Sequence, residues 1–565
     1  MSGPSSQGRR GPSQRGASQR GASQRGASQR GARQRGASQR GARQEGSQSG
    51  RNQSGRSRPG GTGRPAPRRH GADPARRAAY DVLSAVTSRD AYANLMLSAR
   101  LAEDRLTDQD AALATELVYG TLRGLSCYDA IIGVCADRDV DRIDPPVRDV
   151  LRIGTHQLVG MRTKPHAAVA TSVDLAIDVV GRRPSGFVNA VLRRIAQRDL
   201  AGWLEIVAPA RSADPIGHLA IRYSHPRWIV AAIADALGED AADPGLAESG
   251  APLAETEAAL AANGERPVVT LAAVPGLATP GELAGAGAEE ARWSPFGAYL
   301  PHGDPGRLAA VAQRRAGVQD EASQLAVLAL SRVPVAGDER AWLDLCAGPG
   351  GKARLLGGLA AEQGIVLVAA DLHEHRARLT GQALSRIRGT VGSQQDSVGQ
   401  QDSVGQQDSV GQRADGVVAR AVAADGLAPA WRPGAFDRVL ADVPCTGLGS
   451  LRRRPEARWR RSPDDVETLH PLQLGLLRSA LDAVRPGGVV AYVTCTPHLA
   501  ETTGVIEDML AERADVEVLD APALLPEVPD LRCPAPHERY AQFWPHRHGT
   551  DAIFIALLRR TGIRR

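Results

Sequence analysis

Cysteine is scarce in this chain of 565 residues, and the scarcity excludes two kinds of small scaffold. The six cysteines are Cys127, Cys135, Cys346, Cys445, Cys495 and Cys533. They are too few and too irregularly spaced for a disulfide framework, and they lack the paired C-x-x-C spacing that holds zinc. The histidines near Cys533, which are His537, His546 and His548, add no recognised ligand spacing. We therefore expect reduced thiols and no metal site.

Long apolar runs are also lacking. No stretch approaches the roughly 18 to 20 apolar residues that a membrane span needs. The N-terminal sequence MSGPSSQGRR has no apolar core of the kind found in a signal peptide. We expect a soluble, cytoplasmic protein without a membrane partner. At roughly 100 to 200 residues per domain, the length suggests two to four domains.

Lysine is the scarcest charged residue, and arginine carries the basic charge. Residues 1–70 contain sixteen Arg and one Glu but no Lys or Asp, a charge of +15, whereas the whole chain carries +6. The remaining residues therefore sum to −9. A nucleic-acid-binding surface on the folded part must then be a local patch, because its average charge repels phosphate.

The basic segment is a five-residue repeat of the form GASQR, which has no side chain able to form a core. We expect residues 1–72 to be a disordered tail that either binds RNA without sequence preference or only aids solubility. Residues 73–205 show apolar residues at helical spacing with no alternating strand pattern, which predicts an all-helical domain. Residues 206–335 mix helix and strand signals and are expected to form a linking α/β domain.

Short β-branched runs then alternate with helical or loop segments. The runs are AWLDLC, GIVLVAAD, GVVARAVAAD, AFDRVLAD and GGVVAYVTC, and each ends in Asp or Cys. This rhythm predicts a parallel, Rossmann-like α/β domain over 336–562, interrupted by a low-complexity loop at 391–413 to which we assign no function. Ligands of such sheets bind at the carboxyl ends of the strands.

A glycine-rich turn, LDLCAGPGGK (343–352), joins the first run to a helix. It is neither a P-loop nor G-x-G-x-x-G, but it lets a ligand approach the backbone and the helix N-terminus. Asp371 ends the next run and suits a ribose, and Asp425 ends the third and suits an adenine amino group. Together they point to an adenosine-bearing ligand, although turn glycines and helix-capping acids remain the structural alternative.

Two cysteines, Cys445 in DVPC and Cys495 in TC, end two further runs beside this turn. The C5 carbon of cytosine attacks a methyl donor only after a thiolate has added to C6, so C5 methylation requires an activated cysteine. A second acid or base then assists removal of the C5 proton. A lone cysteine is more often a buried structural residue, but a pair beside a nucleotide loop favours chemistry. Spacing alone leaves open which cysteine attacks.

The segments LDLCAGPGGK, LADVPCTGLGSLRRRPEARWR and YVTCTPHLAE, with VQDEASQL and HGTDAIFIALL, resemble the RsmB/Sun (NOL1/NOP2/NSUN) family of RNA cytosine-5 methyltransferases. The helical region is similar to the NusB-like RNA-binding domain of its RsmB branch. The resemblance implies S-adenosylmethionine as methyl donor and 16S rRNA, or a small-subunit assembly intermediate, as substrate.

The resemblance also assigns roles. It implies that Cys495 is the nucleophile, that Cys445 helps release the product, and that Lys352 and Asp442 contact the target base. The implied cofactor-binding residues are Cys346, Ala347, Gly348, Pro349, Gly350, Gly351, Lys352, Asp371, Asp425 and Asp442. Lys352 is one of only two lysines, which favours a role that arginine cannot fill. The family commonly reads TCS where this chain has Thr496.

The residues also leave other interpretations open. The protein could be a noncatalytic RNA-binding or ribosome-assembly factor, or it could methylate another RNA such as tRNA.

The segment 449–463 interleaves arginines with Trp459, and we expect it to bind phosphates and stack a base, with a solvated charged loop as the alternative. His498 is expected to be a loop or surface residue. We expect a monomer.

Overall fold

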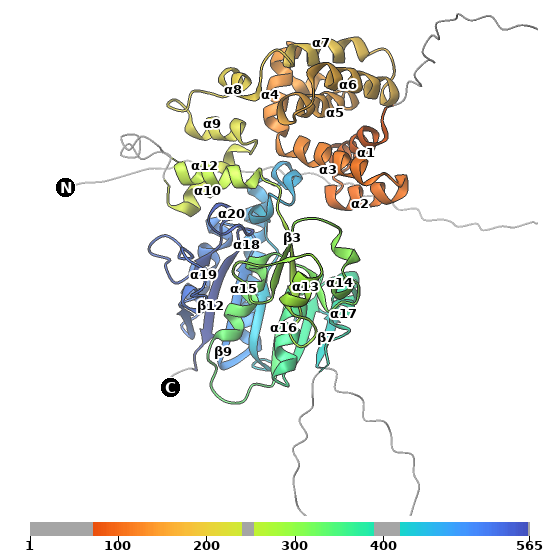
Figure 1. Cartoon of the computed structure of the whole chain (residues 1–565). Helices are drawn as coiled ribbons and strands as arrows, with labels where there is room; N and C mark the ends of the chain where they lie inside the picture. Colours follow the sequence, from red (N-terminus) through yellow and green to blue (C-terminus); the bar gives the residue numbers. More distant parts are fainter. Residues whose placement is uncertain (1–71, 240–252, 389–417, 563–565) are drawn as a thin grey trace, which may run out of the picture. The chain divides into compact units, whose positions relative to one another are not determined.

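A computed structural model describes residues 72–239, 253–388 and 418–562 of the chain (Figure 1). These residues belong to one structural unit, which spans 69–565. The arginine-rich tail up to residue 71 and the low-complexity loop at 391–413 lie outside the described ranges. Within those ranges, no helix is both long enough and apolar enough to cross a membrane.

The N-terminal part of this unit is all-helical, as the apolar spacing predicts. Its helices are α1 (Pro74–Arg89), α2 (Ala93–Asp104), α3 (Asp108–Arg123), α4 (Leu125–Ala136), α5 (Pro145–Thr155), α6 (Pro165–Val179), α7 (Ser185–Ile195) and α8 (Leu200–Val207). Asp73 and Thr107 begin α1 and α3 by accepting hydrogen bonds from backbone amides of the first turn. Leu83, Leu117 and Leu151 are fully buried members of the shared core.

A small mixed region follows. It contains α9 (Pro215–Arg222), α10 (Arg227–Leu237), α12 (Ala254–Asn263), α13 (Pro280–Gly285), α14 (Ala309–Ala312), β1 (Val269–Ala273), β2 (Glu289–Glu290), β3 (Gly297–Leu300) and β4 (Ala316–Val318). The strands form an antiparallel sheet in the order β2-β3-β1-β4. Asp320 then caps α15 (Glu321–Arg332), which leads into the last domain.

The C-terminal domain is built on a larger sheet. Its elements are β5 (Ala341–Asp344), α16 (Gly351–Glu362), β6 (Val366–Asp371), α17 (Glu374–Leu384), β7 (Ala419–Ala423), β8 (Phe436–Asp442), α18 (Pro463–Ala483), β9 (Val484–Thr494), α19 (Thr503–Glu512), β10 (Val516–Leu519), β11 (Ala541–Gln542), α20 (Pro545–His548) and β12 (Phe554–Arg560). The strand order is β10-β12-β9-β8-β5-β6-β7. The five predicted strands are parallel. The sequence did not reveal that β12 pairs antiparallel with β9 and that β10 pairs antiparallel with β12.

Helices cover both faces of this sheet (Figure 1). Trp342 and Leu440 pack with α15, α16 and α17, whereas their strand neighbours Leu343 and Val439 pack with α18 and α19. This alternation follows from the period of two in a strand, and burial on both faces explains the continuous apolar runs. Because β5, β6, β8 and β9 run parallel, their carboxyl ends lie at one edge of the sheet. The strand order reverses between β5 and β8, and such folds bind their ligands at this point.

Candidate active site

A cavity of about 940 Å³ opens at this edge of the sheet. The predicted site residues in its wall are Cys346, Gly348, Asp371, Asp425, Asp442, Cys445 and Cys495. Five strand ends thus meet around one space, as expected from residues that terminate neighbouring parallel strands. The other predicted residues do not line the cavity: Ala347, Pro349 and Gly350 belong to the loop, and Gly351 and Lys352 begin α16.

Glycine is required at different positions of the loop for different physical reasons. The Gly348 amide donates to Asp371 Oδ2 at 3.0 Å, and a Cβ at this position would lie 2.3 Å from the same oxygen. Gly350 has φ +106° and begins α16, so a side chain there would strain the turn. Of these three loop glycines, Gly351 alone has no described atom within 4 Å of where a Cβ would lie. Gly348 and Gly350 thus also serve internal packing and backbone conformation, and the cofactor role expected of the loop glycines remains a prediction.

The two acids expected at an adenosine lie in the wall, each already fixed by backbone amides. Asp371 Oδ1 accepts from His373 N at 2.9 Å, and its Oδ2 holds the glycine loop. Asp425 is exposed and accepts from Leu427 N at 2.9 Å through Oδ1. A carboxylate oxygen has two lone pairs, so each acid keeps capacity for a hydroxyl or amino donor. Their cofactor roles remain predictions.

Asp344 is a polar residue that sequence reasoning missed. It ends β5, has no exposed surface, and neither carboxylate oxygen makes a hydrogen bond of normal geometry with any described residue. Burial, assisted by Asp442, raises the pKa of this carboxyl to about 8, although Lys352 opposes the shift. Such a group is stabilised when a cation comes near it. An acid inside the apolar run AWLDL was the signal that could have drawn attention to it.

Lys352 and Asp442 form an ion pair beside the cysteines. Lys352 Nζ lies 2.9 Å from Asp442 Oδ2, and the two side chains are 12% and 29% exposed. Burial acts to lower the lysine pKa, but Asp442 and neighbouring acidic groups, including Cys495, outweigh it, so the net pKa is raised. Lys352 therefore carries a fixed positive charge at the site and is not a base at neutral pH.

The two cysteines meet although they come from different strands. Cys445 Sγ lies 3.3 Å from Cys495 Sγ, and both thiols are partly buried in the cavity wall. The residues that follow them are also joined, because the hydroxyls of Thr446 and Thr496 lie 3.2 Å apart. The hydroxyl that this chain keeps where the family commonly has serine thus links the two loops.

Glu501 anchors the loop that carries Cys445. Its buried carboxylate accepts from Thr446 N at 2.8 Å and from Gln473 Nε2 at 3.0 Å. Gln473 also donates to the Pro444 carbonyl at 2.9 Å. A carboxylate with several donors holds a loop rigidly, so the cysteine is positioned before any substrate binds.

The surroundings of the two thiols differ in charge. The hydrogen bond from Cys445 lowers the Cys495 pKa, burial and Asp442 oppose this, and Lys352 adds to the lowering. The same hydrogen bond raises the Cys445 pKa, and burial and Glu501 raise it further. Of the two thiols, Cys495 is therefore the one that ionises more readily, and Cys445 is the one that more readily keeps its proton.

Known proteins with similar sequences are methyltransferases. Residues 333–559 match the family model 16S rRNA methyltransferase RsmB/F, and residues 73–197 match the NusB family model. The ribosomal RNA small subunit methyltransferase B of Pseudomonas putida is 30% identical over 86% of this chain and 98% of its own length. A Mycobacterium tuberculosis protein named as a methyltransferase is 48% identical over 87% and 98%. The chain belongs to the RsmB/F methyltransferase family.

Membership in the RsmB/F family confirms the resemblance drawn from the sequence motifs, including the N-terminal NusB domain. It makes this chain an RNA methyltransferase. The crystal structure of PH0851 has the same fold, with a TM-score of 0.63 at 19% identity over 86% of this chain and 99% of that one.

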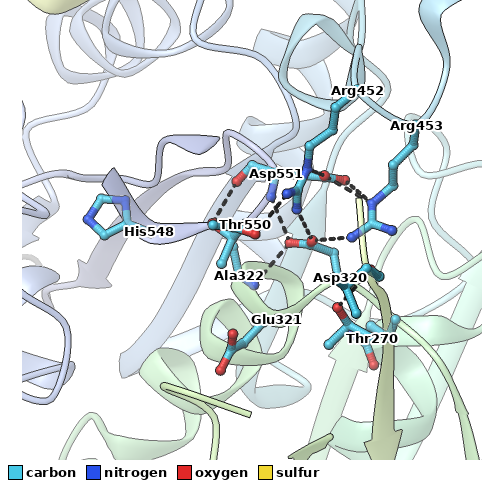
Figure 2. Close-up of polar contacts among 12 residues, drawn as sticks. Thr270, Asp320, Glu321, Ala322, Arg452, Arg453, His548, Thr550 and Asp551 are labelled. Carbon is cyan, nitrogen blue, oxygen red and sulfur yellow. Dashed lines mark hydrogen bonds and ion pairs between the residues drawn. The ribbon is translucent and has the colours of Figure 1, made fainter. Parts of the chain in front are cut away.

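In this RsmB/F family member, the arginine-rich segment after Cys445 is largely internal. Arg452 and Arg453 both bind Asp320 and Asp551, with N–O distances of 2.7 to 3.0 Å (Figure 2). The two acids are at most 8% exposed and the Arg452 side chain only 9%. The predicted phosphate contact is therefore wrong for these two arginines, and so is the solvated loop. They fasten α15 and the turn before β12 to the cysteine loop.

Arg458 is also structural. It is fully buried and donates to the backbone carbonyls of Arg123, Ser224 and Asn263 at 2.7 to 3.1 Å, and burial lowers its pKa to about 9. These acceptors belong to the helical domain and the mixed region, so the residue holds three parts of the chain together. In contrast, Arg454 is exposed and lies in the cavity wall.

His373 lies in the cavity wall beside Asp371, whereas His498 does not line the cavity. His498 lies half-buried in a loop, accepts from the amide of Ala500 at 3.2 Å, and has its ring 6.5 Å from that of Trp228. Among the described residues, no group of three or more His, Cys, Asp or Glu could hold a metal ion.

Proposed function

We propose that this protein methylates C5 of a cytosine in 16S rRNA, with S-adenosylmethionine as donor and through a covalent bond between Cys495 and C6. The single observation that carries the proposal is the pair of thiols, Cys445 and Cys495, 3.3 Å apart in the wall of a cavity that also holds the glycine loop. The names of the relatives, which are small-subunit rRNA methyltransferases, support the substrate.

The residues present fit the donor. Asp344 directly precedes the wall residues Leu345 and Cys346 and is a buried carboxylate without a normal hydrogen bond among the described residues, which suits the ammonium of a methionine group. Asp371 and Asp425 line the cavity at the ends of successive strands, where they suit a ribose and an adenine amino group. When bound, S-adenosylmethionine supplies an electrophilic methyl group. The chain's own residues must bind it and prepare the base.

Preparation of the base falls to Cys495. Its thiolate adds to C6 of the cytosine, the S–C bond forms, and the ring electrons make C5 nucleophilic. Lys352 Nζ is a fixed positive charge within the same cluster and stabilises the negative charge that the ring gains. Asp442 holds that ammonium in place at 2.9 Å.

Release of the product falls to Cys445. Its pKa is raised chiefly by the hydrogen bond to Cys495. Once Cys495 is bonded to carbon it is no longer an anion, so the Cys445 proton passes to solvent more readily. The Cys445 thiolate then takes the C5 proton, the S–C6 bond breaks, and Cys495 leaves as a thiolate. Both thiols return to their starting protonation states.

Methyl transfer to RNA tests the proposal. The full chain is incubated with methyl-labelled S-adenosylmethionine and either 16S rRNA, assembled small subunits or tRNA, and 5-methylcytosine is located by bisulfite sequencing. We expect 5-methylcytosine in 16S rRNA or the small subunit. Label only in tRNA would change the substrate, label at another base atom would overturn the chemistry, and no label with tight RNA binding would support the noncatalytic assembly factor.

A further inference from the structure

Tyr92 is an exposed aromatic side chain of the helical domain that faces the active-site cavity. It lies in the connection between α1 and α2, and its side chain is 53% exposed. The wall of the cavity that holds Cys445 and Cys495 also includes Asp90 and Tyr92. An isolated exposed aromatic residue needs no explanation, but one in the wall of a reaction cavity does.

The position of this connection is fixed by the segment that follows Cys445. Ala93 N donates to Glu456 Oε1 at 3.2 Å, and Glu456 is buried. Arg460 donates to the Ala91 carbonyl, and its guanidinium carbon lies 5.4 Å from the centre of the Tyr92 ring. The ring is thus backed by a cation while more than half of its side chain stays open to solvent. Such an arrangement leaves a supported aromatic face for a ligand.

A second aromatic residue lies in the same wall. Trp459 precedes Arg460, and its indole Nε1 is buried with no hydrogen-bond partner among the described residues. Arg454 is exposed in the wall and has no ion-pair partner within the described part of the chain. Two aromatic rings and an available guanidinium are the groups with which proteins hold unpaired nucleotides: rings stack on bases and arginine binds phosphate.

The reaction creates a need for such contacts. A cytosine buried in a stack cannot reach a thiol, so it must leave the stack, and its neighbours lose stacking energy. We propose that Tyr92 stacks on an unpaired nucleotide flanking the target cytosine, so that the helical domain completes the RNA site at the mouth of the cavity. The proposal rests on the proposed function for its RNA substrate, and Tyr92 acts as a substrate-positioning residue.

Binding of short, unstructured RNA to the full chain tests this inference directly. The RNA carries one cytosine flanked by the fluorescent base 2-aminopurine, whose emission falls when it stacks on an aromatic ring. Tyr92→Ala should weaken RNA binding about tenfold and abolish the quenching, whereas Tyr92→Phe should stay within about twofold because it keeps the ring. Leu95→Ala is the matched control, since Leu95 is 64% exposed on α2 and lies outside the cavity wall.

Steady-state kinetics add a second measurement. Tyr92→Ala should raise the KM for RNA by a similar factor and leave the KM for S-adenosylmethionine unchanged. Equal RNA affinity and quenching in wild type, Tyr92→Ala and Leu95→Ala would overturn the inference, and so would a Tyr92→Phe defect as large as that of Tyr92→Ala. If Tyr92→Ala folds poorly, Tyr92→Leu keeps apolar bulk without a ring and gives the same measurements. A wild-type protein that binds and quenches but never methylates would refute only the proposed function.

Discussion

The sulfur atoms of Cys445 and Cys495 lie 3.3 Å apart although 50 residues separate them in the chain. The charges around them are unequal, because Lys352 lowers the pKa of Cys495 and Glu501 raises that of Cys445. Cys495 is therefore the thiol that ionises more readily, and Cys445 is the one that more readily keeps its proton. Substitutions at and around the pair test this assignment and the structure that supports it.

Replacing Lys352 with methionine removes the cation beside Cys495. The Cys495 pKa should then rise, so less thiolate is present at a given pH. We expect kcat to fall about 100-fold, and the acidic limb of the kcat/KM profile to move to higher pH. Rates of methyl transfer measured from about pH 6 to about pH 9 check both effects.

Lys164→Met is the matched control, because Lys164 is the only other lysine and is exposed before α6. It should leave both the rate and the profile unchanged. A Lys352→Met profile that keeps the wild-type acidic limb would show that Lys352 does not favour the thiolate.

Asp344 makes stability depend on pH. Its pKa is raised from 3.8 to about 8, so the folded state binds a proton more tightly than the unfolded state does. This group therefore favours folding least at high pH: its contribution is lost as pH rises from about 4 and is fully lost above about 8. Asp344→Asn should raise Tm at pH 8.5, or about that value, in the absence of donor, and should flatten the fall of Tm with pH.

The same substitution should weaken donor binding, because an amide cannot offer a negative charge to an ammonium. Isothermal titration with S-adenosylmethionine should show at least an approximately tenfold rise in Kd. Unchanged affinity together with an unchanged Tm profile would mean that Asp344 neither titrates in this range nor contacts the donor.

Arg452 should matter for stability rather than for RNA. Its removal leaves the buried carboxylates of Asp320 and Asp551 without one of the two arginines that neutralise them. We expect Arg452→Ala to lower the free energy of unfolding by about 3 to 5 kcal/mol in urea titrations. Arg454→Ala, at an exposed position in the same segment, should stay within about 0.5 kcal/mol of wild type. Equal stability of the two variants would contradict the structural role of Arg452.

The ends of the strands could be predicted from the sequence because each apolar run stops at a polar residue or a cysteine. Buried parallel strands read as apolar runs, and residues that end such runs converge at one edge, so the strand pattern alone could place Asp371, Asp425, Cys445 and Cys495 around one cavity. Asp344 was missed because a single acid within an apolar run looks like an ordinary strand residue. Its significance depends on burial without a normal hydrogen bond, which only packing reveals.

The arginine-rich segment was mispredicted for a related reason. Composition suggested contact with phosphate, but the partners of Arg452 lie 132 and 99 residues away, at Asp320 and Asp551. The neighbouring sequence does not distinguish an arginine that pairs with a distant acid from one that is available to bind RNA. The antiparallel β12 was missed because an apolar run does not state its direction in the sheet.

The most direct test of the central claim is covalent trapping on RNA that contains 5-fluorocytosine. The fluorine at C5 replaces the proton that must leave, so the adduct cannot break down after methylation, and it is measured as a protein–RNA band that survives denaturation. The account predicts that the wild-type protein forms the band, that Cys495→Ala forms none, and that Cys445→Ala forms it and also accumulates an adduct with ordinary cytosine RNA. A band that persists in Cys495→Ala and disappears in Cys445→Ala would reverse the roles of the two cysteines and contradict the account.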